Sequence, residues 1–559
     1  MTTHKLGIQD LGVHNTASPS EAAPSAPVKS MPTRHLDVDT IESLWSAGWG
    51  AGPTTKQHTP SATGEQGGIQ VGAADAASRS DLVVVANRLP VRRIGDDENT
   101  VWETSPGGLV SALLPTLAGR SVTWIGWTGD VLSPEREPLA PFEHDGMLLE
   151  PIELDDAEVR GFYDGFSNGT LWPLYHDAIV PSEFHRDWWG HYVAVNQRFA
   201  DAAARSAAPG ATVWIHDYQL QLVPQMLRAL RPDVAIGFFL HIPYPPQELF
   251  MRLPWRTELI NGMLGADVVG FQVPVAAQNF AVLAKRLGGA KGNAQRLTVG
   301  ERTVRVGAFP ISIDIERYAR LAADPQTIIG AKEVRERLGN PRIIILGVDR
   351  LDYTKGIEVR LKAYRELLQD GKVGTSDCTL VQIAVPSRSD VPAYGDERDR
   401  IERLVGEING DYGEMGAPAV HYLHRNLSIA ELVELYLAAD LLLVTPYRDG
   451  MNLVAKEYVA CRLDDTGSLV LSEFAGAARE LSAASLVNPY DIAAVKEAIV
   501  SAMKASPRDV QRRMRAMRRA VDRWTVHDWA KVFIDTVTAS TASVPEAPSD
   551  GGAAAVSAP

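Results

Sequence analysis

The sequence predicts an α/β fold with two consecutive domains, each built on a parallel sheet. Short continuous apolar runs alternate with amphipathic segments along most of the chain, as a parallel sheet with crossover helices requires. The length of 559 residues exceeds what one hydrophobic core normally serves. A content of 45% hydrophobic and 22% charged residues is typical of a globular protein.

Twelve apolar runs are expected to form strands, six on each side of a boundary near Pro310. The first six span residues 82–87, 122–129, 212–217, 235–243, 267–272 and 304–310. The second six span residues 342–350, 379–387, 420–425, 441–446, 468–473 and 485–489. We therefore expect an N-terminal domain over residues 81–310 and a C-terminal domain over residues 311–505.

The two ends of the chain differ from this core. Residues 1–80 are rich in Ala, Ser, Gly, Pro and Thr without sustained periodicity, so we expect a disordered extension there, and likewise a disordered tail over residues 540–559. Residues 506–539 are expected to form terminal helices that pack back across both domains. Met514, Met517 and Val521 recur at helical spacing in a basic segment, which favours a solvated face over an apolar stripe rather than a nucleic-acid site.

The charge balance and the cysteines exclude several classes of protein. A balance of 55 basic against 69 acidic residues argues against nucleic acid as the main ligand. Cys378 and Cys461 are the only cysteines, which excludes a disulfide framework and fits a reducing compartment. Without a signal-peptide-like apolar core near the start or an apolar run approaching ~18 residues, we expect a cytoplasmic protein with no membrane partner.

The stretch from Leu441 to Tyr458 combines a buried strand, a loop and the start of a helix. Asp449 lies in the loop and Glu457 a turn into the helix, so both acids should face the carboxyl ends of the strands, where ligands collect in parallel sheets. The backbone N–H groups of Gly450 to Leu453 would be free for an anion or a sugar oxygen. The alternative is that Asp449 only caps a helix and Glu457 is solvated.

Arg350 and Lys355 span the end of a strand and the approach to the next helix. Two cations there would neutralise a nucleotide diphosphate and make it a good leaving group. Since no D-x-D acid pair ends a strand of the folded region, we expect these cations to replace a metal ion. Ordinary surface salt bridges are the alternative.

Glycine and arginine at two further strand ends also fit an anionic ligand. Gly107 and Gly108 precede a helical segment, so a diphosphate or sugar could approach the helix N-terminus without a Cβ in the way. Arg88 directly follows the first strand and could fork onto a phosphate. A plain chain reversal would explain the glycines equally well.

Polar and aromatic residues at other strand ends complete the candidate site. Asp217 and His241 each end an apolar strand of the first half and should face Asp449 from the opposite side. Arg388 ends a strand of the second half, and Tyr163 and Trp172 offer flat faces that stack on sugars. Structural packing is the alternative for each aromatic residue.

Taken in order, these motifs resemble one known family. NRLP, LWPLYHD, WIHDYQL, LHIPYPP, GVDRLDYTKGI, VPSR and TPYRDGMNLVAKEY are together similar to the trehalose-6-phosphate synthase family, over about residues 81–505. The resemblance implies a B-type glycosyltransferase fold, with two Rossmann-like domains facing each other across a cleft. It also implies glucosyl transfer from a nucleoside-diphosphate glucose (UDP- or ADP-glucose) to the anomeric hydroxyl of glucose 6-phosphate, with retention and without a metal or other cofactor.

The resemblance also implies roles for individual residues. Asp449, His241, Arg350 and Lys355 would serve catalysis. The donor would be bound by Gly107, Gly108, Arg350, Lys355, Leu427, Asp449, Gly450, Met451, Asn452, Leu453, Val454, Ala455, Lys456 and Glu457, with Leu427 contacting the base and Glu457 the ribose. The acceptor would be bound by Arg88, Tyr163, Trp172, Asp217 and Arg388.

Two other functions remain open from the sequence. A related retaining transferase, of the sucrose-phosphate or glycogen synthase type, would differ in its acceptor. A catalytically dead sugar-phosphate sensor would lack donor residues, whereas Arg350, Lys355, Asp449 and Glu457 are all present. We further expect a homo-oligomer, a dimer or a tetramer.

Overall fold

The computed structural model describes residues 79–94, 101–105, 108–117, 120–133, 136–388 and 390–541. They all belong to one unit of the chain, Ile69–Pro559. The predicted N-terminal extension and C-terminal tail lie almost wholly outside the described residues. Ser80 already belongs to the first strand and Ser540 to the last helix.

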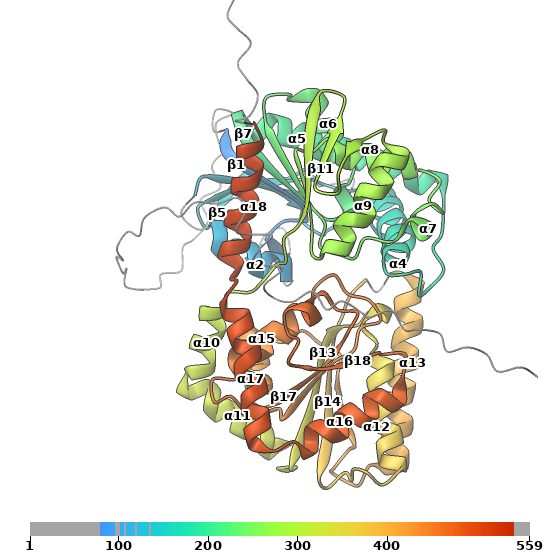
Figure 1. Cartoon of the computed structure of the whole chain (residues 1–559), viewed down its shortest axis with the longest axis vertical. Coiled ribbons are helices and arrows are strands. Elements are labelled where there is room, and N and C mark those ends of the chain that lie inside the picture. Colours follow the sequence, from blue (N-terminus) through green and yellow to red (C-terminus); the bar gives the residue numbers. More distant parts are fainter. Residues whose placement is uncertain are drawn as a thin grey trace, which may run out of the picture. The chain divides into compact units, whose positions relative to one another are not determined.

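The first sheet has ten strands in the order β10-β11-β12-β9-β8-β7-β1-β4-β6-β5. Its inner strands pair in parallel, and antiparallel pairing is confined to its two edges. All six residues of β4 are buried, because helices cover both faces of the sheet (Figure 1). The strands are β1 (Ser80–Arg88), β4 (Val122–Trp127), β5 (Phe142–His144), β6 (Met147–Pro151), β7 (Ala207–His216), β8 (Ala235–Phe239), β9 (Val268–Phe271), β10 (Lys291–Gly292), β11 (Arg296–Val299) and β12 (Arg302–Ala308).

The second sheet has six strands, all parallel, in the order β15-β14-β13-β16-β17-β18. In the central strand, Ile345 lies opposite Leu380 on one side and Leu441 on the other. The strands are β13 (Ile343–Arg350), β14 (Cys378–Val385), β15 (Val420–Leu423), β16 (Leu441–Val444), β17 (Ser468–Ser472) and β18 (Ser485–Val487).

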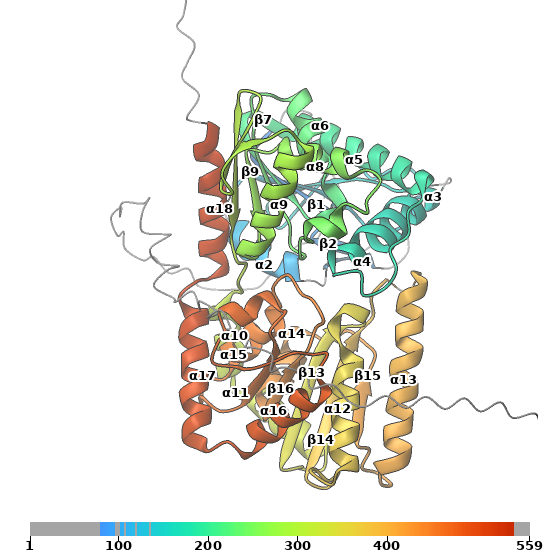
Figure 2. The ribbon, with the colours of Figure 1, turned by 45° about the vertical axis from the view of Figure 1, so that its right-hand side comes forward.

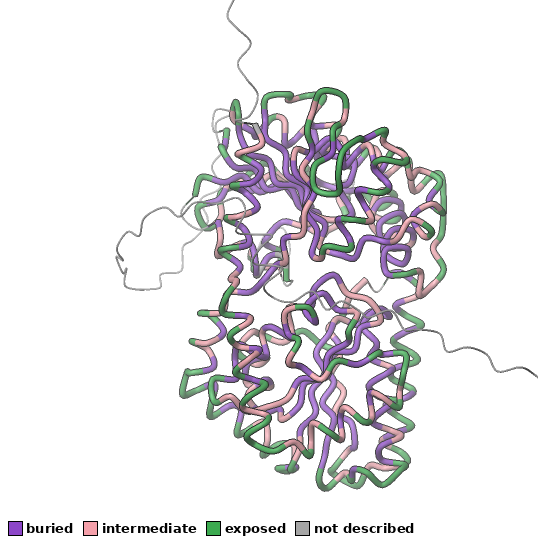
Figure 3. The backbone as a smooth tube through the Cα atoms, viewed as in Figure 1, coloured by how far each residue is buried: buried purple, intermediate pink, exposed green. Residues whose placement is uncertain are grey.

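Helices connect the strands of both sheets, and a short hairpin of β2 (Val91–Ile94) and β3 (Val101–Thr104) follows β1. Figure 3 shows the buried strands enclosed by helices whose outer faces are exposed. Those of the first half are α2 (Gly108–Leu117), α3 (Asp156–Glu158), η1 (Val159–Leu171), α4 (Trp172–Tyr175), α5 (Arg186–Ser206), η2 (Tyr218–Leu220), α6 (Val223–Leu230), α7 (Gln247–Phe250), α8 (Arg256–Leu264) and α9 (Pro274–Leu287). Those of the second half are α10 (Ile315–Ala323), α11 (Pro325–Arg337), η3 (Tyr353–Lys355), α12 (Ile357–Gln369), α13 (Pro392–Tyr412), α14 (Ile429–Ala438), α15 (Leu453–Cys461), η4 (Gly476–Arg479) and α16 (Ile492–Lys504).

The last two helices, α17 (Pro507–Asp522) and α18 (Val526–Thr541), contact different halves of the chain. α17 packs on α15 beside the second sheet, whereas α18 packs on β7, β8 and β9 of the first (Figure 2). In α17 the apolar stripe of Met514, Met517 and Val521 is buried, as the spacing predicts.

Two strand glycines explain the close fit of α18 on the first sheet. A Cβ on Gly237 would lie 2.6 Å from Val537, and one on Gly270 would lie 2.6 Å from Phe533. Both Val537 and Phe533 belong to α18 and are fully buried. The missing side chains therefore let the helix approach the sheet closely.

All twelve predicted strands are present, which confirms the predicted α/β class with parallel sheets. Six further strands were not predicted from the sequence: β2, β3, β5, β6, β10 and β11. Each has at most five residues, and most are partly exposed, so their apolar runs are too short to stand out. Among the helices of the described ranges, none combines the length and apolar character needed to span a bilayer.

Candidate functional site

Many of the predicted site residues lie at or just beyond the carboxyl ends of strands in both sheets, and others lie in helices. Two of the contacts between the halves join strand-end loops directly. The guanidinium of Arg388 donates to the hydroxyl of Tyr218 at 2.9 Å. A Cβ on Gly450 would lie 2.1 Å from the carbonyl oxygen of His241, so the two backbones touch.

Lys355 and Asp449 form an ion pair on the second-sheet side. Lys355 ends η3, and its Nζ lies 2.7 Å from Oδ2 of Asp449, which also accepts from Nδ2 of Asn452 at 3.2 Å. Burial by itself would raise the pKa of Asp449, but Lys355 outweighs it and holds this pKa below its usual value. Asp449 is therefore a carboxylate whose charge is balanced before any ligand binds.

The start of α15 presents the backbone predicted to bind a ligand. Asn452 has φ of +91°, and its side chain caps the helix by accepting from the N–H of Ala455 at 3.0 Å. Met451 is buried, and Leu453 and Val454 are partly buried against a hydrophobic cluster that includes residues of both sheets. The remaining N–H groups of this helix N-terminus carry a partial positive charge.

The side chain of Lys456 points away from that backbone. Its ammonium is buried and donates to the carbonyl of Ile311 at 2.8 Å and to both carboxylate oxygens of Glu480, at 2.8 and 2.9 Å. Any contact between Lys456 and a nucleotide would therefore use its backbone.

Arg350 and Arg388 share one aromatic surface, the ring of Trp172. The guanidinium carbon of Arg388 lies 3.7 Å from the ring centroid and that of Arg350 lies 5.2 Å from it. Asp352 lies 3.6 Å from each guanidinium. Burial by itself would raise the pKa of Asp352. The two arginines act in the opposite direction and help to lower this pKa to about 2. One carboxylate thus faces two guanidinium groups, and a positive charge remains for an anion.

Arg388 makes several contacts that the sequence did not predict. Its side chain is only 6% exposed and donates to the hydroxyls of Tyr218 and Tyr394. Its backbone has φ of +46°, a left-handed conformation that is uncommon outside glycine. Neither tyrosine was predicted as a site residue. Tyr218 directly follows the predicted Asp217 and could have been included, whereas Tyr394 lies inside α13 and gave no signal.

Arg88 and Tyr163 lie together on the first-sheet side. The guanidinium carbon of Arg88 lies 4.0 Å from the centroid of the Trp127 ring and 5.3 Å from that of Tyr163. Burial would raise the pKa of Tyr163, but Arg88 and Arg388 outweigh burial and lower this pKa. Positive charge from both sheets therefore reaches this phenol.

Asp217 and His241 follow neighbouring strands and are bonded to each other. Asp217 has φ of +73°, and its Oδ1 accepts from the backbone N–H of His241 at 3.1 Å. Burial raises the pKa of Asp217 to about 6 and lowers the pKa of His241 to about 3. The His241 imidazole is thus neutral near pH 7. Its Nε2 lies 3.0 Å from Nδ1 of His216, which was not predicted as a site residue.

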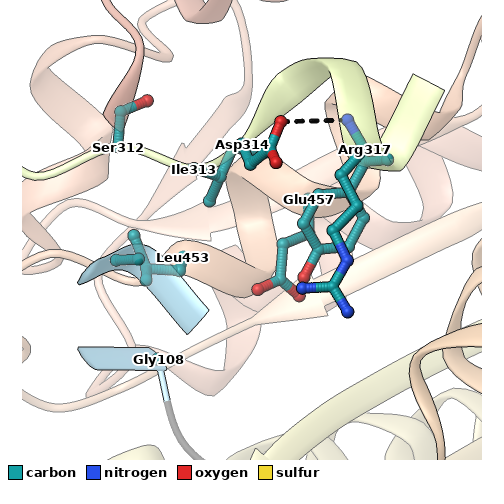
Figure 4. A pocket seen from close by; sticks show the side chains of 9 residues that line it. Gly108, Ser312, Ile313, Asp314, Arg317, Leu453 and Glu457 are labelled. Carbon is teal, nitrogen blue, oxygen red and sulfur yellow. Dashed lines mark hydrogen bonds between the residues drawn. The ribbon is translucent and has the colours of Figure 1, made fainter. Parts of the chain in front are cut away.

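Glu457 lines a small pocket between three helix N-termini (Figure 4). Its Oε2 accepts from the hydroxyl of Tyr436 at 2.8 Å, and burial raises the pKa of the carboxyl. The pocket is lined by Gly108, Ala112, Ser312, Ile313, Asp314, Arg317, Tyr318, Leu453 and Glu457.

Gly108 brings α2 close to α15 in this pocket, because a Cβ there would lie 3.1 Å from Cδ1 of Leu453. Gly107 lies outside the described residues. Leu427 precedes α14 and is partly buried against the hydrophobic cluster that includes residues of both sheets. Within the described ranges, no group of three or more His, Cys, Asp or Glu side chains is arranged to hold a metal ion.

Comparison with known proteins agrees with this geometry. Residues 80–539 match the family described as "Glycosyltransferase family 20". The trehalose-6-phosphate synthase of Mycolicibacterium gilvum is 55% identical over 489 residues, which cover 84% of this chain and 96% of that protein.

Two solved structures show the same fold. The UDP-forming α,α-trehalose-phosphate synthase from Burkholderia xenovorans, in complex with glucose 6-phosphate, has a TM-score of 0.75 and 32% identity, over 82% of this chain and 99% of that one. The Escherichia coli protein bound with UDP-2-fluoro glucose has a TM-score of 0.74 and 33% identity, over 82% and 99%.

The expected pair of Rossmann-like domains, the B-type glycosyltransferase fold, is therefore confirmed. The family match covers every described strand of both sheets. This chain belongs to glycosyltransferase family 20.

Proposed function

We propose that this chain transfers glucose from a nucleoside-diphosphate glucose to the anomeric hydroxyl of glucose 6-phosphate. The products are trehalose 6-phosphate and the nucleoside diphosphate, and the donor configuration is retained. Relatives and solved structures that bear the trehalose-6-phosphate synthase name support this reaction, including one used to study glycosyl transfer with retention.

One observation carries the proposal: positive side chains from both halves of the chain gather in one place. The second sheet contributes Arg350, Lys355 and Arg388, and the first half contributes Arg88 and the Trp172 ring. Arg350 and Arg388 both lie against Trp172, while Lys355 pairs with Asp449. A nucleotide diphosphate and a sugar phosphate together need several positive groups in one place. A protein that bound only a neutral sugar would not need them.

Arg350 and Lys355 would hold the diphosphate of the donor, with the N-terminus of α15 beside it. Arg88 and Arg388 would hold the phosphate of the acceptor, and Tyr163, Trp172 and Asp217 would orient its ring. His241 and Asp449 would contact the donor glucose, and Glu457 the ribose. The charges above support these assignments, because Arg88, Arg350 and Arg388 all act on the phenol of Tyr163. Arg350, Arg388 and Lys355 likewise all act on the carboxylate of Asp352.

The chemical step follows from this arrangement. The bond between C1 of glucose and the phosphate oxygen breaks, and the acceptor hydroxyl bonds to C1 from the same face. The proton of that hydroxyl passes to the departing phosphate oxygen. Asp449 is already bonded to Lys355 and Asn452, so it is poorly suited to be the covalent nucleophile of a double displacement. Positioning and charge stabilisation lower the barrier instead.

The donor base stays open between uracil, adenine and guanine, since the resemblance implies that backbone groups largely read it. We infer no metal or other cofactor, because cations occupy the position where a metal would neutralise the diphosphate. We also infer a cytoplasmic location, from the cysteine content and from the lack of signal-peptide and membrane-span patterns in the sequence. We further propose a homo-oligomer, whose size light scattering would measure. Both cysteines are free and buried, which is compatible with a reducing compartment.

The deciding experiment incubates the full chain with glucose 6-phosphate and either UDP-glucose or ADP-glucose, and identifies the product by NMR. An α,α-1,1-linked disaccharide phosphate is expected. Parallel reactions with fructose 6-phosphate and with glucan test the related transferases. Turnover with either of these and none with glucose 6-phosphate would reject the proposed acceptor. Binding of both ligands without any turnover would instead favour a sensor.

A further inference from the structure

The segment between β12 and α10 is held from two directions at Ile311. Its N–H donates to Oε1 of Gln272 at 2.9 Å, and its carbonyl accepts from Nζ of Lys456 at 2.8 Å. Gln272 follows β9 of the first sheet, whereas Lys456 lies in α15 beside the second. Ile311 is buried, so its two backbone groups depend on these partners rather than on water.

The bond to Ile311 fixes the orientation of the Gln272 amide. A backbone N–H can only donate, so the atom that faces it must be the amide oxygen. The amide nitrogen Nε2 then points toward Nδ1 of His241, 3.5 Å away. Because this nitrogen carries two hydrogens and accepts nothing, Nδ1 of His241 must be the ring nitrogen without a proton.

The proton of the neutral His241 ring therefore sits on Nε2. That atom lies 3.0 Å from Nδ1 of His216, so His241 donates and His216 accepts. His216 ends β7 and is fully buried. Burial lowers the pKa of both imidazoles, so both rings are neutral near pH 7 and the tautomer is well defined.

Among the contacts of His241 with described residues, the polar contact to Nδ1 comes from Gln272, and the others involve the ring faces, Nε2 or the backbone. Phe239 and Trp529 pack against the ring, at centroid distances of 4.7 and 6.0 Å. The carboxyl of Asp217 binds the backbone N–H of His241 rather than its ring. At 3.5 Å the contact from Gln272 is long, so the Nδ1 lone pair can still accept from a ligand hydroxyl.

We infer that Gln272 is a positioning residue, which holds His241 as the Nε2–H tautomer and keeps Nδ1 as an acceptor for a hydroxyl of the donor hexose. Gln272 also links this ring to Ile311, whose carbonyl accepts from Lys456 of α15, beside the second sheet. The identity of the hexose rests on the proposed function. The tautomer of His241 does not depend on the proposed function, so an experiment can reject either one without rejecting the other.

The first test is spectroscopic and needs no ligand. In the full chain labelled with ¹⁵N-histidine, two-dimensional NMR distinguishes the two neutral tautomers, and a His241→Asn variant assigns the signals. His241 is expected as the Nε2–H form. In Gln272→Glu, one carboxylate oxygen can still accept from the Ile311 N–H, while the other faces Nδ1 and draws a proton to it. An Nδ1–H form in the unaltered chain, or unchanged signals in Gln272→Glu, would overturn the inference.

The second test measures turnover of UDP-glucose and glucose 6-phosphate against pH. Gln272→Glu should lower kcat/KM for the donor by about tenfold or more, because the acceptor atom is lost. The KM for glucose 6-phosphate should stay within about twofold, and the pH profile should gain a limb from the raised pKa of His241.

Gln326→Glu is the matched control, because it makes the same charge change at an exposed position in the first turn of α11. It should keep full activity. Equal activity and equal pH profiles for Gln272→Glu and Gln326→Glu would refute the positioning role. If the unaltered chain makes no disaccharide at all, the proposed function fails, and the NMR result still decides the tautomer.

Discussion

The guanidinium carbon of Arg388 lies 3.7 Å from the ring centroid of Trp172, although the two residues belong to different halves of the chain. Arg388 follows β14 of the second sheet, whereas Trp172 begins α4 in the first half of the chain. The same guanidinium donates to Tyr218 and Tyr394. A fixed, stacked arginine between the two halves is well suited to bind a phosphate that must sit next to the donor.

Arg388→Lys should weaken acceptor binding selectively. Lysine keeps the charge but loses the planar fork and the stack on Trp172, so the KM for glucose 6-phosphate should rise by roughly tenfold to a hundredfold. Initial rates at varied acceptor and donor measure this. Arg398→Lys, which alters an exposed arginine paired with Glu402, is the control and should leave both KM values unchanged. A rise confined to the donor KM would reverse the assignment.

Lys355→Met should chiefly lower the rate of the chemical step. Loss of one cation at the departing diphosphate costs about 3 kcal/mol of transition-state stabilisation, which is roughly a hundredfold in kcat/KM. Lys362→Met removes an exposed lysine paired with Glu358 and controls for loss of charge. If Lys355→Met kept the kcat/KM of the unaltered chain, the cation would have no part in catalysis.

Asp217→Asn should stabilise the fold and impair activity. Because burial raises the pKa of Asp217 to about 6, the folded state binds this proton more tightly than the unfolded chain does. The charged form therefore costs stability above pH 6, and the cost disappears as the pH falls toward 4. Asparagine can still accept from the N–H of His241.

The expected gain for Asp217→Asn is about 1 kcal/mol in the free energy of unfolding at pH 7.5, since partial exposure of the residue screens the full effect. Urea denaturation at pH 7.5 and at pH 4 measures it, and the gain should vanish at the lower pH. A gain that is equal at both values would show that the charge of Asp217 is not its source. Turnover should fall because Asp217 would no longer bind the acceptor as a carboxylate.

Exhaustive EDTA treatment should leave turnover intact. Arg350 and Lys355 occupy the place at which a divalent ion would otherwise neutralise the diphosphate, so chelation removes nothing that the reaction needs. The measurement compares initial rates before and after dialysis against EDTA, with added magnesium or manganese as the reference. Loss of activity that either ion restores would show that the cations do not suffice.

The long elements of this fold could be predicted because each buried strand carries an uninterrupted apolar run. β13 and β16 are examples, with almost every side chain buried. The edge strands could not, since β10 has two exposed residues and its pairing depends on neighbours far along the chain.

Candidate site residues could be selected where a polar residue ends such a run, as with Asp217, Arg350 and Arg388. The contacts among these residues could not be predicted, because they join residues that are distant in sequence. Lys456 illustrates this limit: its place beside Glu457 indicates a ligand contact, yet its ammonium is buried against Ile311 and Glu480. Gln272 gave no signal at all, since its role depends on two bonds that only the folded chain supplies.

Gly450→Ala should separate the loops of the two sheets. The added Cβ would lie 2.1 Å from the carbonyl oxygen of His241, so one backbone has to move. Overpacking of this kind costs about 1–3 kcal/mol in stability, and kcat should fall by more than tenfold because donor and acceptor groups move apart. Thermal unfolding and initial rates measure both.

Gly406→Ala is the matched control for that change. Gly406 lies on the exposed face of α13, and nothing lies within 4 Å of its missing Cβ. Alanine there should stabilise the protein by about 0.5–1 kcal/mol, since it lowers the entropy of the unfolded chain, and turnover should not change. If Gly450→Ala also kept normal kcat and stability, the close approach of Gly450 to His241 would not be required for the working arrangement of the two sheets.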